Sequence, residues 1–536
     1  MVQTKLTTVS DKKKRTITKA EELAKGQREI SVAEFFTKNR HLLGFDNPRK
    51  ALLTTVKEAV DNSLDACEEM NVLPDVSVKI IALGGKEASV ADRFVVTIED
   101  NGPGVVKKQI PNIFAKLLYG SKFHSMKQSR GQQGIGISAA GMYGQLTTGK
   151  PVKITSKIDP KRNAMYYELH IDTQKNEPEI LKEEEVEWEK DHGTKVTIEL
   201  EAKYVKGKQS VDEYLKQTAI ANPHVTLTYI SPEKKKTNFP RVTEEMPAEA
   251  KSIKPHPYGV ELGILMKMLK STKAKNLQAF LKKDFSRVSP KIAKEICDKA
   301  GVYEKSRPSR IATQEADNLF KAINITKIMA PPTNCLVPIG KDLIEKGLKK
   351  EIDADFYIAV TRPPAVYRGN PFQIEVGLAY GGDIPSDHIS RVIRFANRVP
   401  LLYQQSSGAV FKAILGTNWR NYSLSQSKGA LPTGPLIIMV NIASVWVPFT
   451  SESKEAIAHY PQIIKEMKLA LQEAGRQLSI HIRKRKHAEH EEKKKSYIEK
   501  YLPHVGIALK EILNLKQTEE QKVEVNLKKI LEKHRE

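Results

Sequence analysis

Cysteine is scarce in this chain: its 536 residues include three, Cys67, Cys297 and Cys335, far apart and without a CxxC pair. Thiols so few and so widely spaced exclude a disulfide framework and a cysteine zinc site, and they favour a reducing, intracellular compartment. The sequence also lacks any apolar run of about 18 residues, the length that spans a membrane. We therefore expect a cytoplasmic protein that neither crosses a membrane nor is secreted.

Acidic residues are the minority among the charged ones. There are 87 Lys and Arg residues against 64 Asp and Glu residues, which gives a formal net charge of +23. A surplus of this size commonly indicates a polyanionic partner, most often nucleic acid, with a membrane surface second. Hydrophobic residues make up 40% of the chain, a share typical of proteins with packed cores, so we do not expect global disorder.

Length and local composition predict several domains. At roughly 100 to 200 residues per domain, the chain has room for two to four. Alternating helical patterns and β-rich runs predict two α/β domains, with a Lys- and Pro-rich linker and a group of short helices between them. In chain order we expect a basic arm at 1–30, an α/β domain at 31–230, a linker at 231–256, a small helical domain at 257–324, a second α/β domain with a crossover at 325–460, a long amphipathic helix at 461–505 and a tail at 506–536.

A helix with three polar side chains on one face is predicted in the first α/β domain. Asn47 precedes Pro48, a pair that starts helices, and apolar residues then recur at helical spacing to about residue 70. Glu58, Asn62 and Asp65 stand at i, i+4 and i+7 and therefore share a face. Taken alone, such a trio is typical of a solvated polar surface.

Two glycine-rich segments that follow this helix in the sequence favour a functional role for its polar face. The β-rich run 94–99 leads into D-N-G-P-G (100–104), so that a strand delivers an acid onto a turn. Further along, R-G-Q-Q-G-I-G-I-S (130–138) precedes small helix-forming residues. Glycines let backbone amides approach a phosphate, and the start of the next helix adds unpaired N–H groups. The loop is not the dinucleotide fingerprint, which joins the first strand and helix of a βαβ unit.

The first α/β domain resembles the GHKL ATPase superfamily. The four motifs of that superfamily correspond, in order, to E-A-V-D-N-S-L-D-A (58–66), D-N-G-P-G, G-Q-Q-G-I-G and Gly193-Thr194 before a β-rich run. Three later features narrow the resemblance: the helical insert that starts at H-P-Y-G-V-E-L-G (256–263), the block Q-S-K-G-A-L-P (426–432) and the long terminal helix. Together they resemble the B-subunit family of DNA topoisomerase VI over about residues 30–505. The resemblance implies a GHKL (Bergerat) ATPase sandwich, a helix-two-turn-helix domain, and an α/β transducer domain with a stalk helix.

The resemblance assigns roles to the polar face. Glu58 is implied to be the general base that orients and deprotonates the water attacking the γ-phosphate of ATP. Asn62 is implied to be a ligand of Mg²⁺, and one helical turn between a carboxylate and an amide oxygen suits these two tasks. Asp65 is either a supporting hydrogen-bonding residue near the adenine or a structural cap.

The adenine and the nucleotide lid are assigned by the same resemblance. Asp100 is implied to accept the adenine amino group, with Thr194 behind it and Gly104 letting the base lie against the backbone. Ser121 and Lys122 fall in the segment between the second and third motifs, which folds over the nucleotide and contacts its phosphates in the family.

The phosphates are implied to lie on an amide cradle and beside one lysine. Lys428, in Q-S-K-G-A-L-P, is expected to swing a positive charge from the second α/β domain toward the γ-phosphate. Arg130 is either a phosphate contact or a surface charge. The cradle residues are Gly131, Gln132, Gln133, Gly134, Ile135, Gly136, Ile137 and Ser138.

The implied partner is an A subunit that cleaves DNA, because this chain shows neither an acidic cluster for a cleaving metal nor a tyrosine in a recognisable cleavage context. The family then implies an A2B2 heterotetramer, dimerisation of two B chains on ATP binding, and capture of double-stranded DNA. A sensor histidine kinase is disfavoured, since His41 is the sole histidine before Glu58. A basic nucleic-acid scaffold with inert ATP motifs is the remaining alternative.

Overall fold

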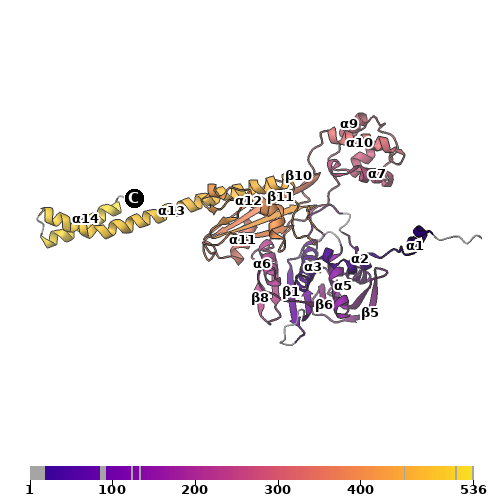
Figure 1. The fold of residues 1–536 in the computed structure, drawn as a ribbon, viewed down its shortest axis with the longest axis horizontal. Helices are drawn as coiled ribbons and strands as arrows, with labels where there is room; N and C mark the ends of the chain where they lie inside the picture. The colour runs from indigo at the N-terminus through magenta and orange to yellow at the C-terminus, as the bar shows by residue number, and fades with distance from the viewer. Residues whose placement is uncertain are drawn as a thin grey trace, which may run out of the picture.

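The computed structural model describes residues 18–84, 92–121, 125–131, 134–451, 453–513 and 516–533. Two main sheets, a group of short helices and a long terminal helix make up this part of the chain (Figure 1). Lys122, Gln132 and Gln133 of the expected site lie outside the described residues, as do the first 17 residues of the basic arm. None of the helices described is long and apolar enough to cross a membrane.

The first sheet has eight strands in the order β5-β4-β3-β6-β2-β1-β7-β8. Neighbouring strands are antiparallel, except that β1 and β7 run parallel. The strands are β1 (Asp75–Ala82), β2 (Asp92–Glu99), β3 (Val152–Lys157), β4 (Ala164–Asp172), β5 (Glu177–Val186), β6 (Gly193–Ala202), β7 (Thr226–Ile230) and β8 (Lys236–Phe239). Strand β8 comes from the 231–256 stretch that was expected to be a linker. We call this sheet and the helices packed on it the first domain.

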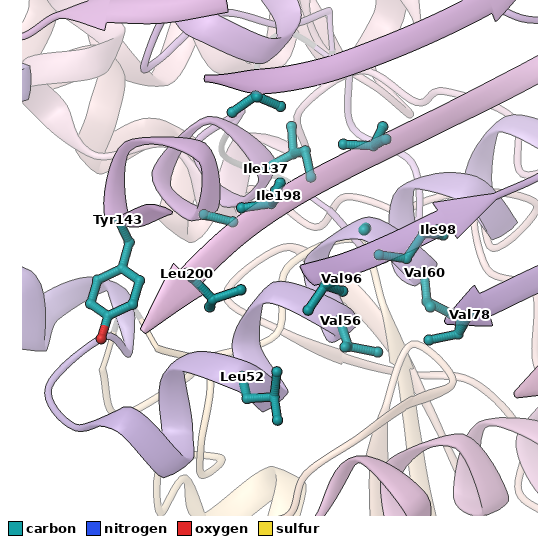
Figure 2. Packing of buried hydrophobic residues seen from close by; sticks show 14 of the residues in the cluster. Leu52, Val56, Val60, Val78, Val96, Ile98, Ile137, Tyr143, Ile198 and Leu200 are labelled. Carbon is teal, nitrogen blue, oxygen red and sulfur yellow. The ribbon is translucent and has the colours of Figure 1, made fainter. Parts of the chain in front are cut away.

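Helix α3 crosses the core of the first domain, and the helix expected over 48–70 is confirmed. Asn47 caps it by accepting a hydrogen bond from the Lys50 amide at 2.9 Å, and Pro48 occupies its first turn. Figure 2 shows its apolar side chains facing those of the sheet, among them Leu52, Val56, Val60, Val96 and Ile98. Helix α3 is Pro48–Glu69, and the other helices of this domain are α2 (Val32–Lys38), α4 (Ile110–Ala115), α5 (Gly136–Thr148) and α6 (Val211–Ala221). Helix α1 (Lys19–Lys25) belongs to the expected arm; it has no buried residue and lies apart from the sheet in Figure 1.

The second sheet is covered on both faces. Helices α12 and the start of α13 pack on one face and α11 on the other, so every residue of β16 is buried. Strands β12 and β16 run parallel with α12 between them, which confirms the expected crossover. Its elements are α11 (Lys341–Glu351), β9 (Phe356–Thr361), β10 (Ala365–Tyr367), β11 (Asn370–Tyr380), β12 (Arg391–Ala396), β13 (Val399–Pro400), α12 (Ala409–Leu415) and β16 (Leu436–Ser444), with a small hairpin of β14 (Ser425–Gln426) and β15 (Pro432–Thr433). We call this unit the second domain.

The short helices between the two sheets form a module with a core of its own. They are α7 (Leu262–Ser271), α8 (Leu277–Asp284), α9 (Pro290–Ala300) and α10 (Thr313–Ile325), and in Figure 1 they lie apart from both sheets. Ser289 caps α9 by accepting a hydrogen bond from the Ile292 amide, as its position before Pro290 predicts.

The terminal helix α13 (Pro461–Leu513) starts in the core of the second domain and then leaves it (Figure 1). Ile463, Met467 and Leu471 are fully buried, whereas residues 483–494 are exposed. The helix passes through Pro503 and ends eight residues later than expected, at Leu513 rather than at 505. A second helix, α14 (Gln517–Lys533), folds back along it.

Candidate active site

A cavity of about 620 Å³ opens between helix α3, the glycine loop and the second domain. Glu58 and Asn62 line it from α3, one helical turn apart, and Asn62 is exposed to it. Other expected site residues that line it are Ser121, Gly131, Gly134, Ile135, Gly136 and Ile137; Ser138 is buried behind them. The structure thus brings the implied base, the implied Mg²⁺ ligand and most of the described cradle together.

The glycine loop lies directly against the two polar residues of α3. A Cβ atom on Gly136 would stand 1.8 Å from Glu58 Oε2, and one on Gly131 would stand 3.5 Å from Asn62 Oδ1. Helix α5 begins at Gly136, so its first amides point toward the same place. The free N–H groups and the helix dipole make this end of α5 suitable for a phosphate.

Asp100 is held in a buried cluster beyond the lining of this cavity. Its carboxylate accepts hydrogen bonds from the Ser63 hydroxyl at 2.8 Å and from the Gly102 and Thr194 amides at 2.9 and 3.0 Å. Burial raises the pKa of Asp100, and the hydrogen bonds oppose that rise. The expected proximity of Asp100 and Thr194 is confirmed. A Cβ on Gly104 would stand 2.2 Å from the Lys157 carbonyl oxygen, so strand β3 already requires a glycine there.

Asp65 lies between helix α3 and the start of the glycine loop. It forms a salt bridge of 2.9 Å with Arg130, and it is also near the Gly131 amide, at 3.4 Å. Arg130, left open by the sequence, is buried and donates to Glu68 at 2.7 and 2.8 Å and to Asn222 at 2.6 Å. This salt bridge is a structural contact, and the adenine-side role of Asp65 stays a prediction beside the structural one. The pair fastens the start of the glycine loop to α3.

Glu68 is the anionic centre of this buried network. It accepts a hydrogen bond from His224 at 2.9 Å in addition to those from Arg130. Burial disfavours its charge, but Arg130 and His224 hold the pKa of Glu68 well below its usual range. The carboxylate is therefore ionised at neutral pH.

Lys428 is placed away from the cavity. It stands on the exposed turn between β14 and β15 and is not among the residues that line the cavity. Lys454, in the loop that follows β16, lines the cavity instead, and its ammonium lies 3.4 Å from the Arg130 carbonyl oxygen. Burial lowers the pKa of Lys454, and the Glu58 carboxylate opposes that shift. Lys454 was not predicted as a site residue; the pattern in the sequence that points to it is a second lysine on the other side of the buried strand β16 from Lys428.

The loop that carries Lys454 is fastened to the first domain by its next residue. Glu455 forms an ion pair with Lys50 of α3 and accepts a hydrogen bond from Gln404 at 2.5 Å. Lys50 also pairs with Asp46 at 3.0 Å, and its ammonium lies 5.4 Å from the centre of the Tyr403 ring. Burial alone would lower the pKa of Lys50, but Glu455 and Asp46 raise it. Both domains therefore build the cavity.

A second buried carboxyl lies one residue before the implied metal ligand. Asp61 accepts a hydrogen bond from the Tyr214 hydroxyl of α6 at 2.9 Å. Burial raises the pKa of Asp61 to about 7, with the Lys57 charge opposing the rise. No group of three or more acidic, histidine or cysteine residues that would hold a metal occurs in the described part of the chain.

The fold and the site define a class of protein: residues 47–204 match the family described as histidine kinase-, DNA gyrase B-, and HSP90-like ATPase. Residues 331–495 match the topoisomerase VI B subunit transducer family. The chain belongs to the family of type 2 DNA topoisomerase 6 B subunits, as the motifs predicted.

The relatives that show this family cover most of the chain. The B subunit of type 2 DNA topoisomerase 6 from Methanococcoides burtonii is 51% identical over 92% of this chain and 79% of its own length. That of Archaeoglobus fulgidus is 49% identical over 91% of this chain and 80% of its own. A solved structure, the B-subunit of DNA gyrase from Myxococcus xanthus, aligns over 83% of this chain and 95% of its own with 11% identity and a TM-score of 0.41.

Proposed function

We propose that this chain binds ATP with Mg²⁺ in the cavity, hydrolyses it, and uses the cycle to gate the passage of one DNA duplex through another. The observation that carries the proposal is the placement of Glu58 and Asn62 against the first turn of α5, with Lys454 reaching in from the second domain. A base, a metal ligand, an amide cradle and a cation are the parts that phosphoryl transfer needs.

Each residue contributes one step. Glu58 orients the attacking water and takes its proton. The amides of the described cradle and of the α5 start hold phosphate oxygens, and Lys454 supplies positive charge where negative charge develops at the γ-phosphate. Asn62 would hold Mg²⁺, which neutralises phosphate charge when bound. Asp100 accepts the adenine amino group from its buried position. We assign no contact with the nucleotide to Lys428, which lies on an exposed turn.

The gate also needs a partner that cleaves DNA. We propose that this is the A subunit, in an A2B2 complex whose two B chains dimerise when ATP binds and close around a duplex. The exposed part of α13 is the candidate contact, because a long charged helix carries exposed apolar residues there, namely Tyr497, Ile498, Tyr501, Val505, Ile507, Ile512 and Leu513. A cytoplasmic, DNA-associated location follows from this role.

Relaxation of a supercoiled plasmid tests the proposal. The full chain is mixed with a candidate A subunit, Mg²⁺ and ATP, and ATPase activity is measured in parallel with and without DNA. We expect ATP-dependent relaxation and DNA-stimulated hydrolysis. DNA binding without any hydrolysis would instead support the alternative of a basic scaffold with inert ATP motifs.

A further inference from the structure

Three consecutive residues before the glycine loop are held by the second domain. Gln128 and Val337 pair twice: the Gln128 amide side chain donates to the Val337 carbonyl oxygen at 3.0 Å, and the Val337 amide donates back at 2.7 Å. The Gln128 backbone amide also donates to the Cys335 carbonyl oxygen at 3.0 Å. The segment that leads into α11 therefore holds Gln128, two residues before Arg130, by three hydrogen bonds.

The backbone carbonyl groups of the next two residues, Ser129 and Arg130, are contacted by two other parts of the second domain. The Ser129 carbonyl oxygen accepts from the Asn397 side chain at 3.0 Å, and the Arg130 carbonyl oxygen is the group that Lys454 approaches. On the opposite side, Arg130 and Gly131 are fastened to α3 through Asp65. We call residues 128–130 the anchor.

The turn that reaches the anchor is built for that position. Asn397 and Arg398 form the tight turn between β12 and β13, with φ of 50° and 68°, a left-handed conformation that is uncommon for residues other than glycine. The Asn397 side chain also accepts from the Ser444 amide at 2.8 Å, and the Arg398 amide donates to Asn441 at 3.3 Å. Two-residue hairpin turns of this kind require a positive φ at both positions, and strand β16 fixes the turn further through these two contacts.

We propose that Gln128 and Asn397 are positioning residues for ATP hydrolysis: they make the start of the glycine loop move with the second domain. This inference rests on the proposed ATPase function. Because the same stretch contacts Lys454, the cradle and the lysine reach a γ-phosphate together or not at all. Neither residue lines the large cavity, so neither is expected to touch the nucleotide.

Gln145 provides a matched control for Gln128. Its side chain donates to the Ile171 carbonyl oxygen at 3.2 Å and accepts from the Ile171 amide at 2.8 Å, so it makes the same double pair within the first domain. Both glutamines are half-buried. We expect Gln128→Ala to lower kcat about tenfold or more with KM for ATP within about twofold, and Gln145→Ala to leave kcat close to wild type.

A double-mutant cycle on the full chain asks whether Gln128 acts through the second domain. If both residues serve one coupled movement, Gln128→Ala combined with Lys454→Ala should hydrolyse no more slowly than Lys454→Ala alone, within about twofold. Gln145→Ala combined with Lys454→Ala should show the product of the two single effects. Losses that multiply for the Gln128 pair would overturn the inference.

Asn397→Gly supplies a second, independent variant, because glycine accepts the left-handed turn while the side-chain contacts with Ser129 and with Ser444 are lost. It should reproduce the kcat loss and the non-additivity with Lys454→Ala, at unchanged affinity for a fluorescent ATP analogue. A normal kcat in both Gln128→Ala and Asn397→Gly would contradict the positioning role that we propose for these two residues. A wild-type chain without ATPase activity would contradict the proposed function itself, so the two failures are told apart by the wild-type control.

Discussion

Gly136 has no side chain because Glu58 occupies the space where a Cβ atom would stand, 1.8 Å from its Oε2. The implied base and the start of the phosphate cradle therefore lie in direct contact. Preorganised contacts of this kind are the main source of catalytic power in phosphoryl transfer.

Replacing Glu58 by alanine should leave ATP binding intact and slow hydrolysis at least about 100-fold, since removal of a general base typically costs that much. Single-turnover hydrolysis of radiolabelled ATP measures the effect, and the ATP-bound variant should accumulate as a dimer. Glu69→Ala is the control, because Glu69 is an exposed carboxylate at the end of the same helix. Hydrolysis at the wild-type rate in Glu58→Ala would show that another group is the base.

Lys454→Ala should keep ADP binding but lose most ATP hydrolysis and nearly all strand passage, because the lost charge acts mainly on the γ-phosphate. Lys428→Ala, on its exposed turn, should hydrolyse ATP at close to the wild-type rate. Steady-state ATPase assays without DNA compare the two. The opposite ranking would restore Lys428 to the site.

His224 should make stability depend on pH. Burial lowers the pKa of His224, against the opposing effect of Glu68, so the folded chain resists protonation where the unfolded chain accepts it. Stability is full above the unfolded pKa of about 6.5 and falls as pH drops below it, by up to about 1.4 kcal/mol per pH unit. Urea unfolding of wild type and His224→Gln at pH 7.5 and 5.5 measures this. An equal drop in both proteins would exclude His224 as the source.

The sequence was sufficient for the parts of the site that lie close together along the chain. Glu58 and Asn62 are one helical turn apart. The glycine loop is followed directly by helix-forming residues, and its place in the order of the four sequence motifs identifies it. Lys454 could not be found in this way, because it stands more than 300 residues beyond the loop that it approaches. The contact of Asp65 with Arg130 likewise depends on tertiary folding, which local spacing does not express.

At the scale of elements, hydrophobic periodicity predicted the buried strands and helices and missed those without it. Strand β5 is rich in glutamate and mostly exposed because it forms the edge of the first sheet, where charge prevents unwanted pairing. Strand β8, the opposite edge, lies in a stretch whose Lys- and Pro-rich composition predicts a linker. Helix α13 continues through Pro503 although proline inside a helix costs about 3 kcal/mol. We attribute this to packing with α14, which the local sequence does not reveal.

Truncation of α13 tests which element carries the partner contact. A chain ending at residue 483 keeps the part of the helix that packs in the core of the second domain, to Ile482, and should retain its fold and nucleotide-driven dimerisation. It should no longer co-purify with the A subunit, because the exposed apolar residues beyond 483 are lost. A chain ending at residue 513, which lacks α14 but keeps all of α13, is the control for the exposed end of α13. Undiminished capture by the shorter chain would place the contact elsewhere.

At the scale of the whole molecule, the positive charge is spread over several units. Exposed basic residues follow α13 after it leaves the second domain, among them Arg483, Lys484, Lys486, Lys493 and Lys494. Others stand on the helical module, among them Lys267, Lys270, Lys282, Lys291 and Lys294. Charges so dispersed suit a partner with an extended, uniform charge, such as the backbone of a duplex, rather than a compact anion.

DNA binding should therefore weaken steeply with salt and depend little on base sequence. If six to ten phosphates are neutralised, affinity should fall about 10³- to 10⁵-fold between 50 and 200 mM salt, because bound counterions are released on association. Fluorescence anisotropy with two duplexes of equal length and scrambled sequence measures both properties, and the two duplexes should agree within about threefold at each salt concentration. A gate that passes any duplex cannot depend on base contacts, so a strong preference for one sequence at fixed salt would contradict the topoisomerase role. Affinity that hardly changes across the salt range would instead show that the surplus of +23 serves something other than DNA.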